Sequence, residues 1–480
     1  MEERQFQVEA CRQLNTLLNN SRHPVYLAPC GTGKTYTAAK LIEDRISLGR
    51  RVYVLVPQVE IFDEWMKVLS EANLNPGYIN DEGIRGKGRG VYVCMTLSLI
   101  NLLAHIPESI YPDEIITDEM QHSLASSWEQ VYSYFGQALR IGLTATLYHG
   151  SLRSFEHLYT HVIQTISKSQ AIEQGYITKP LLVVPEKWAG NVPMNGEDFD
   201  AEAQAKILGK AKIIGNVIDF YERTFEGQPV IIPCATYGMC EIVMEAFNER
   251  GWKFEHLHYR LRKSERKRIL RAVAAGKING ICTVGIGIEG MSIHGLYGVL
   301  WLRRTASPII WTQFNGRAER VVKGKEYYIC ADFVGNSVIH GMPDRDLFWT
   351  LEQEGAEIRE PDEDRPVMVE CWNCGVMNSG LNEVCHFCGQ VMDGVEADLE
   401  REQQGFPAME AGNLVFLEST GEVFESRQIH AAEIKEDMAA ARLEAPLQSI
   451  SDRDKVSLLH KNLFKGGRRK MFEETLKEWI

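Results

Sequence analysis

Two short stretches of the sequence hold residue types that can bind and hydrolyse a nucleoside triphosphate. The first, APCGTGKT, spans residues 28–35. Its glycines let successive backbone N–H groups curl around a phosphate, Lys34 can reach the terminal phosphate oxygens, and the Thr35 hydroxyl can hold Mg²⁺. A plain strand-to-helix turn is the alternative for this stretch taken alone. The residues predicted to bind nucleotide here are Pro29, Cys30, Gly31, Thr32, Gly33, Lys34 and Thr35.

The second stretch, in DEIITDEMQH, supplies two carboxylates. Asp118 and Glu119 directly follow an apolar β-type segment that contains Ile115 and Ile116. In a P-loop ATPase, an Asp at the end of such a strand holds Mg²⁺ through water, and a neighbouring Glu accepts a proton from the attacking water. An isolated Asp-Glu pair is usually a solvated turn, so this prediction depends on the glycine-rich loop that precedes it.

The elements around both stretches follow from apolar patterning. HPVYLA predicts a strand that ends near Leu27, and TYTAAKLIEDRIS predicts a helix with one apolar face. Further along, PVIIPCAT, NGICTV and GVLWLRR read as strands, and EIVMEAFNERG reads as a helix between them. Strands that alternate with helices in this way favour a parallel α/β sheet.

At this point the chain resembles the superfamily 2 DEAD/DEAH-box helicases, in particular the XPB-like and RadD-like branch of bacteria and phages. The resemblance runs from about residue 4 to residue 345, with the motifs in the family's order. Besides the two stretches above, it is carried by RQFQ (4–7), VYVLVPQVEIFDEW (52–65), VCMTLSL (93–99), LTAT (143–146), GIGIEGMSI (285–293) and QFNGRAER (313–320).

The resemblance implies ATP and Mg²⁺ as ligands and assigns roles to further residues. The catalytic set is Lys34, Asp118, Glu119, Gln121, Arg317 and Arg320, in which the two arginines stabilise charge on the γ-phosphate. Arg4, Gln7, Gly287, Glu289, Gly290 and Gln313 are expected to bind the nucleotide. Thr96 is expected to lie on the nucleic-acid path, and Thr144 and Thr146 are expected to couple that path to ATP.

Two positions depart from the family pattern. Gln121 stands where the family has a histidine, with His122 directly after it, and Ser292 stands where an aspartate is common. A glutamine side chain can both donate and accept hydrogen bonds. We therefore expect an active ATPase.

The implied fold class is α/β: two tandem RecA-like P-loop domains, with a C-terminal zinc-ribbon-like module and a small α+β tail. The expected boundaries are 1–165 and 166–345 for the two RecA-like domains and 346–367 for an acidic linker. A four-cysteine module is expected at 368–392 and a tail with a hairpin and a terminal helix at 393–480.

The segment CWNCGVMNSGLNEVCHFCG holds two Cys-x-x-Cys pairs. Their spacing predicts a structural Zn²⁺ held by Cys371, Cys374, Cys385 and Cys388. An iron–sulfur centre and a site without metal are the alternatives. The module's role is open between nucleic-acid binding and protein docking.

Two basic segments are candidates for contact with a nucleic-acid backbone. One contains Arg85, Lys87 and Arg89, and the other is the arginine- and lysine-rich stretch 260–271. On a helix the second segment would spread its charges around much of the circumference, so an ordinary charged surface is the alternative. Phosphate contacts of this kind are independent of base sequence and sensitive to salt.

The bulk composition fits these predictions. The 480 residues are too many for one core, the net charge is −13, and no apolar run long enough to cross a membrane and no signal peptide are present. We expect a cytoplasmic protein, in the host cytoplasm if a phage encodes it, without a membrane partner.

The predicted function is an ATP-dependent DNA helicase or translocase that acts on single-stranded or branched DNA. The alternatives are an RNA helicase, an ATP-gated nucleic-acid clamp, or the motor subunit of a restriction or defence complex. The C-terminal region would meet replication, repair or defence proteins.

Overall fold

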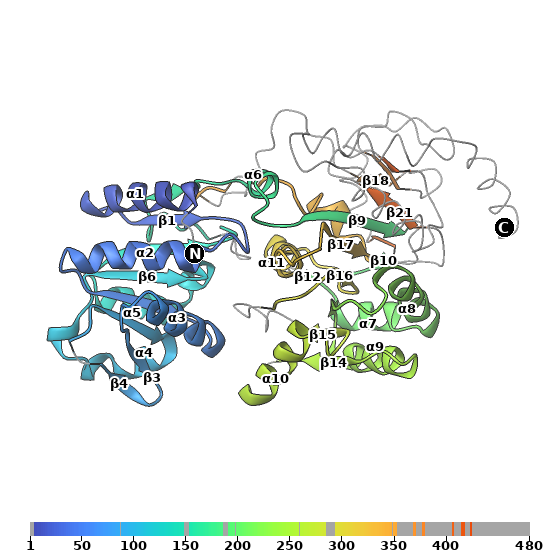
Figure 1. Cartoon of the computed structure of the whole chain (residues 1–480), viewed down its shortest axis with the longest axis horizontal. Coiled ribbons are helices and arrows are strands. Elements are labelled where there is room, and N and C mark those ends of the chain that lie inside the picture. Colours follow the sequence, from blue (N-terminus) through green and yellow to red (C-terminus); the bar gives the residue numbers. More distant parts are fainter. Residues whose placement is uncertain are drawn as a thin grey trace, which may run out of the picture.

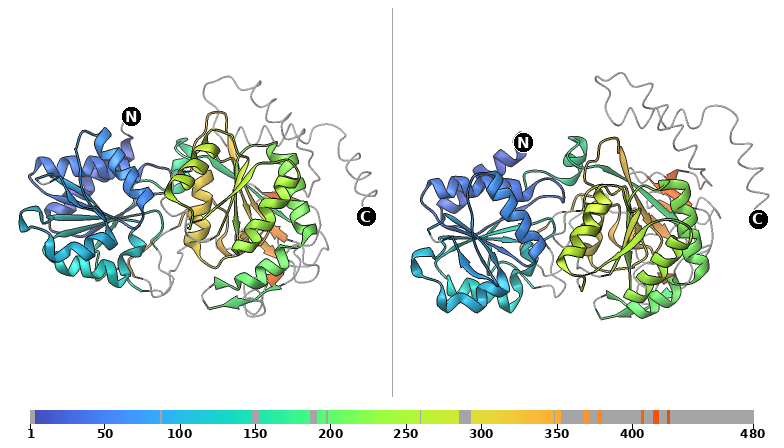
Figure 2. Two further views of the ribbon diagram at one scale, coloured as in Figure 1. Left: turned by 90° about the horizontal axis from the view of Figure 1, so that it is seen from below. Right: turned by 60° about the horizontal axis from the view of Figure 1, so that its bottom comes forward.

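A computed structural model describes residues 4–86, 88–147, 153–185, 191–196, 198–258, 260–284, 293–347 and 349–352, and five short strands between 368 and 424. The described chain forms two α/β lobes that stand side by side, the first in blue and cyan and the second in green and yellow (Figure 1). Both views of Figure 2 show helices on either side of the sheet in each lobe.

The sheet of lobe 1 has the strand order β4-β3-β5-β2-β6-β7-β1-β8. All its neighbours pair in parallel except β3 and β4. The strand bounds are β1 (Pro24–Leu27), β2 (Val52–Val56), β3 (Gly77–Asn80), β4 (Gly83–Arg85), β5 (Val91–Met95), β6 (Glu114–Asp118), β7 (Leu139–Thr144) and β8 (His161–Ile163). Residues 52–56 are all fully buried, as expected for a parallel strand covered on both faces.

Two layers of helices cover this sheet. Helices α1 (Gln5–Asn19), α2 (Lys34–Ser47) and α3 (Val59–Glu71) share one apolar core with the sheet. Helices α4 (Thr96–Leu102) and α5 (Ser126–Tyr134) share the other, together with the short 3₁₀ turns η1 (Leu103–His105), η2 (Glu108–Ile110) and η3 (Met120–Leu124). A buried ion pair at 2.5 Å joins Arg45 of α2 to Glu114 of β6. Helix α2 follows the glycine-rich loop, and β6 ends at Asp118, so the pair connects the two elements that carry the predicted site residues.

The sheet of lobe 2 has the strand order β14-β15-β13-β16-β17-β9-β21-β22. The bounds are β9 (Lys179–Pro185), β13 (Val230–Cys234), β14 (Phe254–Leu257), β15 (Gly280–Val284), β16 (Gly298–Trp301) and β17 (Tyr327–Asp332), all parallel. From the C-terminal part of the chain, β21 (Leu414–Leu417) and β22 (Val423–Phe424) form an antiparallel hairpin whose first strand pairs with β9. The predicted hairpin therefore extends this sheet.

Seven helices belong to the described part of lobe 2 and its connection to lobe 1. They are α6 (Lys168–Glu173), α7 (Ala201–Leu208), α8 (Ala211–Phe225), α9 (Tyr237–Glu249), α10 (Lys263–Ala274), α11 (Pro308–Ala318) and α12 (Asn336–His340). Helix α11 begins with the Ser307 hydroxyl accepting the backbone N–H of Ile310 and with proline in its first turn, both common at helix starts. Three two-stranded pairs complete the described strands: β10 (Asn191–Val192) with β20 (Phe406–Pro407), β11 (Met194–Asn195) with β12 (Asp198–Phe199), and β18 (Met368–Glu370) with β19 (Met377–Ser379).

Two segments of the described chain connect the lobes. Helix α6 lies in the first segment, and the second is made by residues 342–347 and 349–352, here called the return segment. The Asp346 carboxylate accepts the backbone N–H groups of Lys168 and Ser169 at 2.6 and 3.0 Å. The Leu351 carbonyl accepts the backbone N–H of Phe155 at 3.0 Å, in lobe 1. The start of the expected acidic linker therefore contacts both α6 and lobe 1.

Among the described residues, no helix is both long enough and apolar enough to span a membrane.

Candidate functional site

The glycine-rich loop joins β1 to α2. Gly31 and Gly33 have φ angles of +77° and +92°, a region that glycine adopts without the steric cost of a Cβ. Lys34 is the first residue of α2, and its Nζ lies 3.0 Å from Ala28 O and 3.3 Å from Pro29 O. The ammonium and the N-terminus of α2 thus face the same loop, an arrangement that favours an anion.

Arg4 and Gln7, at the start of α1, lie against this loop. Arg4 Nη1 and Gln7 Nε2 both donate to the carbonyl oxygen of Thr32 at 3.3 Å. A Cβ on Gly33 would come within 2.9 Å of Gln7 Nε2, so only glycine allows this approach. The Arg4 guanidinium also lies 4.2 Å from the centre of the Tyr176 ring, a cation–π contact with a residue that the sequence analysis did not single out.

The carboxylates Asp118 and Glu119 stand at the end of β6, at the sheet edge where the other parallel strands also end. Asp118 Oδ1 accepts the backbone N–H of Glu119 at 3.0 Å, and Asp118 Oδ2 accepts the indole N–H of Trp65 at 2.7 Å. Glu119 has a φ of +52°, a conformation that costs about 1 kcal/mol or more for a residue with a Cβ and occurs mainly at functional sites.

Burial and the Glu119 carboxylate both raise the pKa of Asp118, while the Lys34 ammonium lowers it. Two carboxylates held side by side at a partly buried edge repel each other. A divalent cation bound there would remove this repulsion and favour the ionised form of Asp118. The hydroxyl and carboxylate oxygens that Thr35 and Asp118 offer are donor types that suit Mg²⁺.

Gln121 makes hydrogen bonds in two directions, to Glu119 and to Thr144. Its Nε2 donates to Glu119 Oε2 at 2.9 Å, and its Oε1 lies 3.2 Å from Thr144 Oγ1. The Thr144 hydroxyl lies 2.6 Å from the carbonyl oxygen of Thr146 and accepts the Thr146 N–H at 3.0 Å. One chain of hydrogen bonds thus connects residues 119–121 with residues 144–146.

Gln313, Gly316 and Arg317 lie on helix α11 of lobe 2, and Arg320 lies two residues beyond its end. Of these residues, Gly316 and Arg320 approach the glycine-rich loop of lobe 1. A Cβ on Gly316 would lie 2.5 Å from Cys30 Cβ and 2.8 Å from its Sγ, and a Cβ on Gly31 would lie 3.7 Å from Arg320 Cγ. Burial, and next the neighbouring Arg317 cation, lower the pKa of Arg320 to about 10. Two guanidinium groups therefore stand close together beside the loop that is built for an anion.

Buried contacts fix the C-terminal end of α11. The ammonium of Lys325 donates to Ala318 O and Arg320 O, both at 2.6 Å, and to Leu296 O at 3.0 Å. The Glu319 carboxylate pairs with Lys168 of α6 at 2.5 Å. The sequence analysis missed Lys168, Glu319 and Lys325, for which the only local signal is that Glu319 lies inside QFNGRAER.

The close approach of Gly316 to Cys30 leads to a prediction. Gly316→Ala places a methyl group against Cys30 and should push the two lobes apart, lowering the kcat of ATP hydrolysis by about tenfold to 100-fold. Gly238→Ala is the matched control, because a Cβ at that α9 position meets nothing within 4 Å. Adding Cys30→Gly to Gly316→Ala removes the clashing atoms and should restore part of kcat. Equal rates for the Gly316 and Gly238 variants would contradict the contact.

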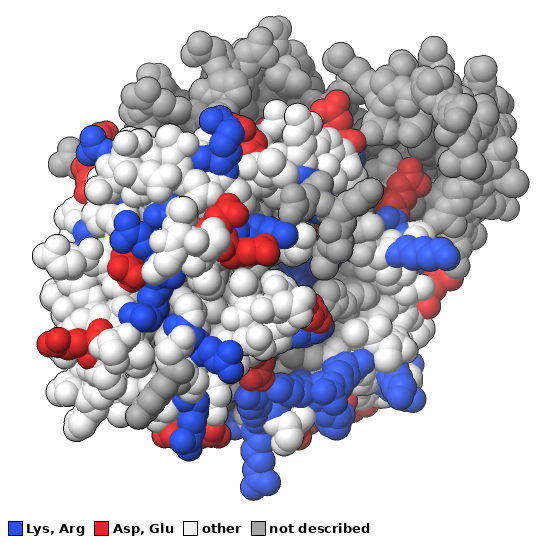
Figure 3. Space-filling model, turned by 60° about the vertical axis from the view of Figure 1, so that its left-hand side comes forward, with Lys and Arg blue, Asp and Glu red and all other residues white. Residues whose placement is uncertain are grey.

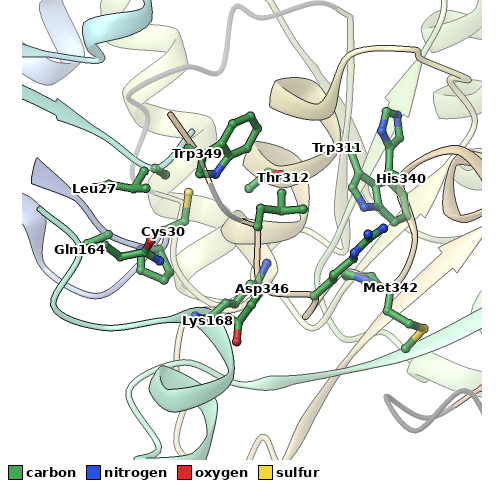
Figure 4. A pocket seen from close by; sticks show the side chains of 16 residues that line it. Leu27, Cys30, Gln164, Lys168, Trp311, Thr312, His340, Met342, Asp346 and Trp349 are labelled. Atoms are coloured by element: carbon green, nitrogen blue, oxygen red, sulfur yellow. Dashed lines mark hydrogen bonds between the residues drawn. The ribbon is translucent and has the colours of Figure 1, made fainter. Parts of the chain in front are cut away.

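A pocket lies between the two lobes beside this contact (Figure 4). It is lined by Cys30 of the loop, Trp311 and Thr312 of α11, Lys168 of α6 and Trp349 of the return segment, among others. Residues 31–35, Asp118 and Glu119 are not among its lining residues. The pocket therefore marks where the lobes and the return segment meet, and it shares only Pro29 and Cys30 with the residues predicted to bind nucleotide in the glycine-rich loop.

The cations of the basic stretch 260–271 form ion pairs with two different parts of the molecule. Lys263 and Lys267 of α10 pair with Asp63 at 3.0 and 2.7 Å, and Arg266 pairs with Glu60 at 2.6 Å, both acids being on α3 of lobe 1. We call these five residues the α3–α10 bridge. Arg268 pairs within lobe 2, with Glu255. Figure 3 shows lysines and arginines gathered along the lower edge of the molecule, at the height at which Figure 1 places α10.

Of the remaining predicted residues, some are exposed, one is buried and several lie outside the described part of the chain. Arg85 and Arg89 are exposed beside the edge strand β4. Thr96 is buried and its hydroxyl donates to Val56 O at 3.1 Å, so this side chain joins two strand ends and does not face solvent. Lys87, Gly287, Glu289, Gly290, Ser292 and the four cysteines Cys371, Cys374, Cys385 and Cys388 lie outside the described residues. Within the described ranges, no group of three or more His, Cys, Asp or Glu side chains is placed to hold a metal ion.

Comparison with known proteins identifies two domains. Residues 1–149 match the family "Type III restriction enzyme, res subunit", and residues 209–322 match "Helicase conserved C-terminal domain". Together the two matches cover more than half of the chain.

A relative and two solved structures extend over most of the described chain. A "51.5 kDa protein" of Lactococcus phage (isolate 7-9) is 23% identical over 368 residues, which are 75% of this chain and 76% of that protein. A fragment structure from Vibrio vulnificus YJ016, assigned to the HsdR subunit of a type I restriction enzyme, has a TM-score of 0.55 at 18% identity and covers 73% of this chain and 68% of that one. The ATP-dependent type ISP restriction-modification enzyme LlaBIII bound to DNA has a TM-score of 0.51 at 18% identity, over 69% of this chain and 27% of that one. These likenesses support two RecA-like lobes.

Proposed function

Because the chain belongs to the superfamily 2 helicases, which hydrolyse ATP, we propose that it is a motor that uses ATP to move along or remodel DNA. The observation that carries the proposal is the contact of lobe 2 with the glycine-rich loop, where Gly316 of α11 abuts Cys30 and Arg320, just after α11, lies against Gly31. ATP bound at that loop would join the two lobes, and hydrolysis would let them separate. Repeated closing and opening of the lobes would move the nucleic-acid contacts of each lobe along a strand.

The residues take the following roles in this proposal. Lys34 binds the terminal phosphates, and Glu119, held by Gln121, accepts a proton from the attacking water. Arg317 and Arg320 stabilise the charge that develops on the γ-phosphate. Thr35 and Asp118 would hold Mg²⁺, which supplies further charge neutralisation to the phosphates.

The experiment that tests the function is a steady-state ATPase assay with single-stranded DNA, duplex, forked DNA and RNA side by side. We expect stimulation by DNA, and a rate that rises with duplex length if the protein translocates. Stimulation by RNA alone would make it an RNA helicase. A rate that does not depend on track length would make it an ATP-gated clamp, and no stimulation by any nucleic acid would contradict the proposal.

A second candidate is the motor of a restriction or defence complex, whose nuclease is another chain. The match of residues 1–149 to a restriction-enzyme family and the restriction enzymes among the similar structures favour it. Affinity purification from the native host should then recover a nuclease together with the tagged protein. In this proposal the protein acts in the cytoplasm, and its C-terminal region is where a partner would bind.

The α3–α10 bridge leads to a prediction about nucleic-acid affinity. Glu60 and Asp63 neutralise three cations of α10 that could otherwise contact phosphates. The double variant Glu60→Gln with Asp63→Asn should therefore raise affinity for single-stranded DNA about tenfold at low salt. The slope of log affinity against log salt concentration should become more negative by about 2. Fluorescence anisotropy across a salt series measures both.

The matched control for that double variant is Glu255→Gln, which releases only Arg268, a cation paired inside lobe 2. It should change affinity little, because Arg268 lies on another side of α10. If the bridge variant binds DNA no more tightly than the control does, α10 is an ordinary charged helix and does not contact phosphate.

The four-cysteine segment carries a metal prediction. The proposal is supported by the spacing of the two Cys-x-x-Cys pairs, which suits one tetrahedral ion, and these cysteines lie outside the described residues. The purified protein should contain about one Zn²⁺ per chain by elemental analysis. Cys374→Ser with Cys388→Ser should release the metal, leave basal ATP hydrolysis in place and weaken its coupling to DNA or to a partner. Iron, or no metal, in the unaltered protein would contradict this assignment.

A further inference from the structure

Trp65 of α3 makes a contact that the proposed catalytic roles do not use. Its side chain is fully buried in the core that α3 shares with the sheet of lobe 1. Its indole N–H donates to Asp118 Oδ2 at 2.7 Å. A buried tryptophan N–H usually finds an acceptor, but here the acceptor is the carboxylate expected to hold Mg²⁺.

Asp118 accepts hydrogen bonds from two neutral donors. Oδ2 receives the Trp65 indole, and Oδ1 receives the backbone N–H of Glu119 at 3.0 Å. Both donors are neutral, so they fix the orientation of the carboxylate without neutralising its charge. Each carboxylate oxygen has a second lone pair and can still accept from a water molecule on the metal. This arrangement orients an acid for a cation better than an ion pair with Lys or Arg would.

The position of Trp65 on α3 adds a link to lobe 2. The same helix carries Glu60 and Asp63, which form ion pairs with α10 of lobe 2. Trp65 lies two residues after Asp63 and five after Glu60 on α3, so a shift of this helix when lobe 2 moves would be passed to Asp118 through one hydrogen bond. The orientation of the Mg²⁺-holding group is thereby tied to contact between the lobes.

We propose that Trp65 is a positioning residue that holds Asp118 in the orientation required by the metal and ties that orientation to α3. The inference rests on the proposed role of Asp118 and adds to it a dependence on α3. It requires that removing one N–H group changes the Mg²⁺-dependent behaviour of the site and leaves metal-independent nucleotide binding alone.

The test replaces the indole in two ways. Trp65→Phe deletes the N–H, and 3-benzothienylalanine at the same position replaces N–H by sulfur while keeping the shape, which covers the case in which Trp65→Phe does not fold. Both changes should lower the DNA-stimulated kcat about tenfold and raise the KM for ATP no more than several-fold. The affinity for a fluorescent ADP analogue should fall several-fold in Mg²⁺ and stay constant in EDTA.

Trp252→Phe is the matched control. The Trp252 indole also donates to a carboxylate, Glu222 Oε1 at 3.0 Å, but in lobe 2 and away from the glycine-rich loop. It should change neither kcat nor Mg²⁺-dependent nucleotide affinity. If both Trp65 changes behave like Trp252→Phe, Trp65 has only a packing role and the inference is wrong.

A fourth variant, Asp118→Asn, separates the inference from the proposed function. Asp118→Asn should abolish stimulated hydrolysis. If it does not, the assignment of Asp118 fails, and the inference fails with it. If Asp118→Asn is inactive and the two Trp65 changes leave kcat and Mg²⁺-dependent affinity as they were, the site stands and only the role of Trp65 falls.

Discussion

Lys34→Ala is expected to reduce nucleic-acid-stimulated ATP hydrolysis to a few per cent or less of the unaltered rate. The Lys34 ammonium lies over the loop, within 3.3 Å of two of its carbonyl oxygens, where the terminal phosphates of a bound nucleotide would meet it. No other change is expected in the loop, because its shape depends on the φ angles of Gly31 and Gly33. Phosphate release with saturating DNA measures the rate, and circular dichroism checks the fold.

Lys40→Ala is the control for this variant. Lys40 belongs to the same helix, α2, but is exposed and pairs with Glu43 at 3.1 Å on its surface. Its loss should leave the rate within about twofold, since exposed ion pairs on a helix contribute little. Residual stimulated activity well above a few per cent in Lys34→Ala would show that ATP is not held by this loop.

The local elements of both lobes could be predicted from the sequence because their signals are local. Continuous apolar runs such as VYVLV become fully buried parallel strands, and the strand, glycine-rich turn and helix at residues 24–47 form where they are expected. The hairpin at 414–424 also follows from its pattern, but its pairing with β9 does not. The residues of β9 lie far away in sequence, and a strand pattern does not name the neighbour of a strand.

The contacts that tie the site together are long-range, and the sequence does not reveal them. The motif containing Trp65 was recognised, yet only the fold shows that its indole reaches Asp118. The charges of α10 are spread around much of the helix, so whether they face solvent, phosphate or protein depends on Glu60 and Asp63, about two hundred residues earlier. Conversely, the sequence did not show whether Gln121 connects Glu119 with Thr144. In the structure Gln121 is hydrogen-bonded to both residues.

Arg317→Ala and Arg320→Ala are each expected to lower kcat on the order of 10³-fold while changing the KM for ATP far less. Negative charge on the γ-phosphate oxygens develops most in the transition state, so a guanidinium aimed at them contributes more to the rate than to binding. Arg320 is already a costly group without ATP, because burial and Arg317 lower its pKa to about 10. A polyphosphate beside it would relieve that cost.

Two comparisons test this interpretation of the arginines. Arg320→Lys keeps the charge but loses the planar fork, and it should restore only a small part of kcat if geometry as well as charge is required. Arg223→Ala, on an exposed face of α8 where Arg223 donates to Asp219 O of its own helix, should leave both constants unchanged. If Arg317→Ala and Arg320→Ala raise KM and leave kcat as it was, these arginines bind ATP in its ground state. Hydrolysis would then not depend on α11 reaching across from lobe 2, and lobe closure could not be the step that gates it.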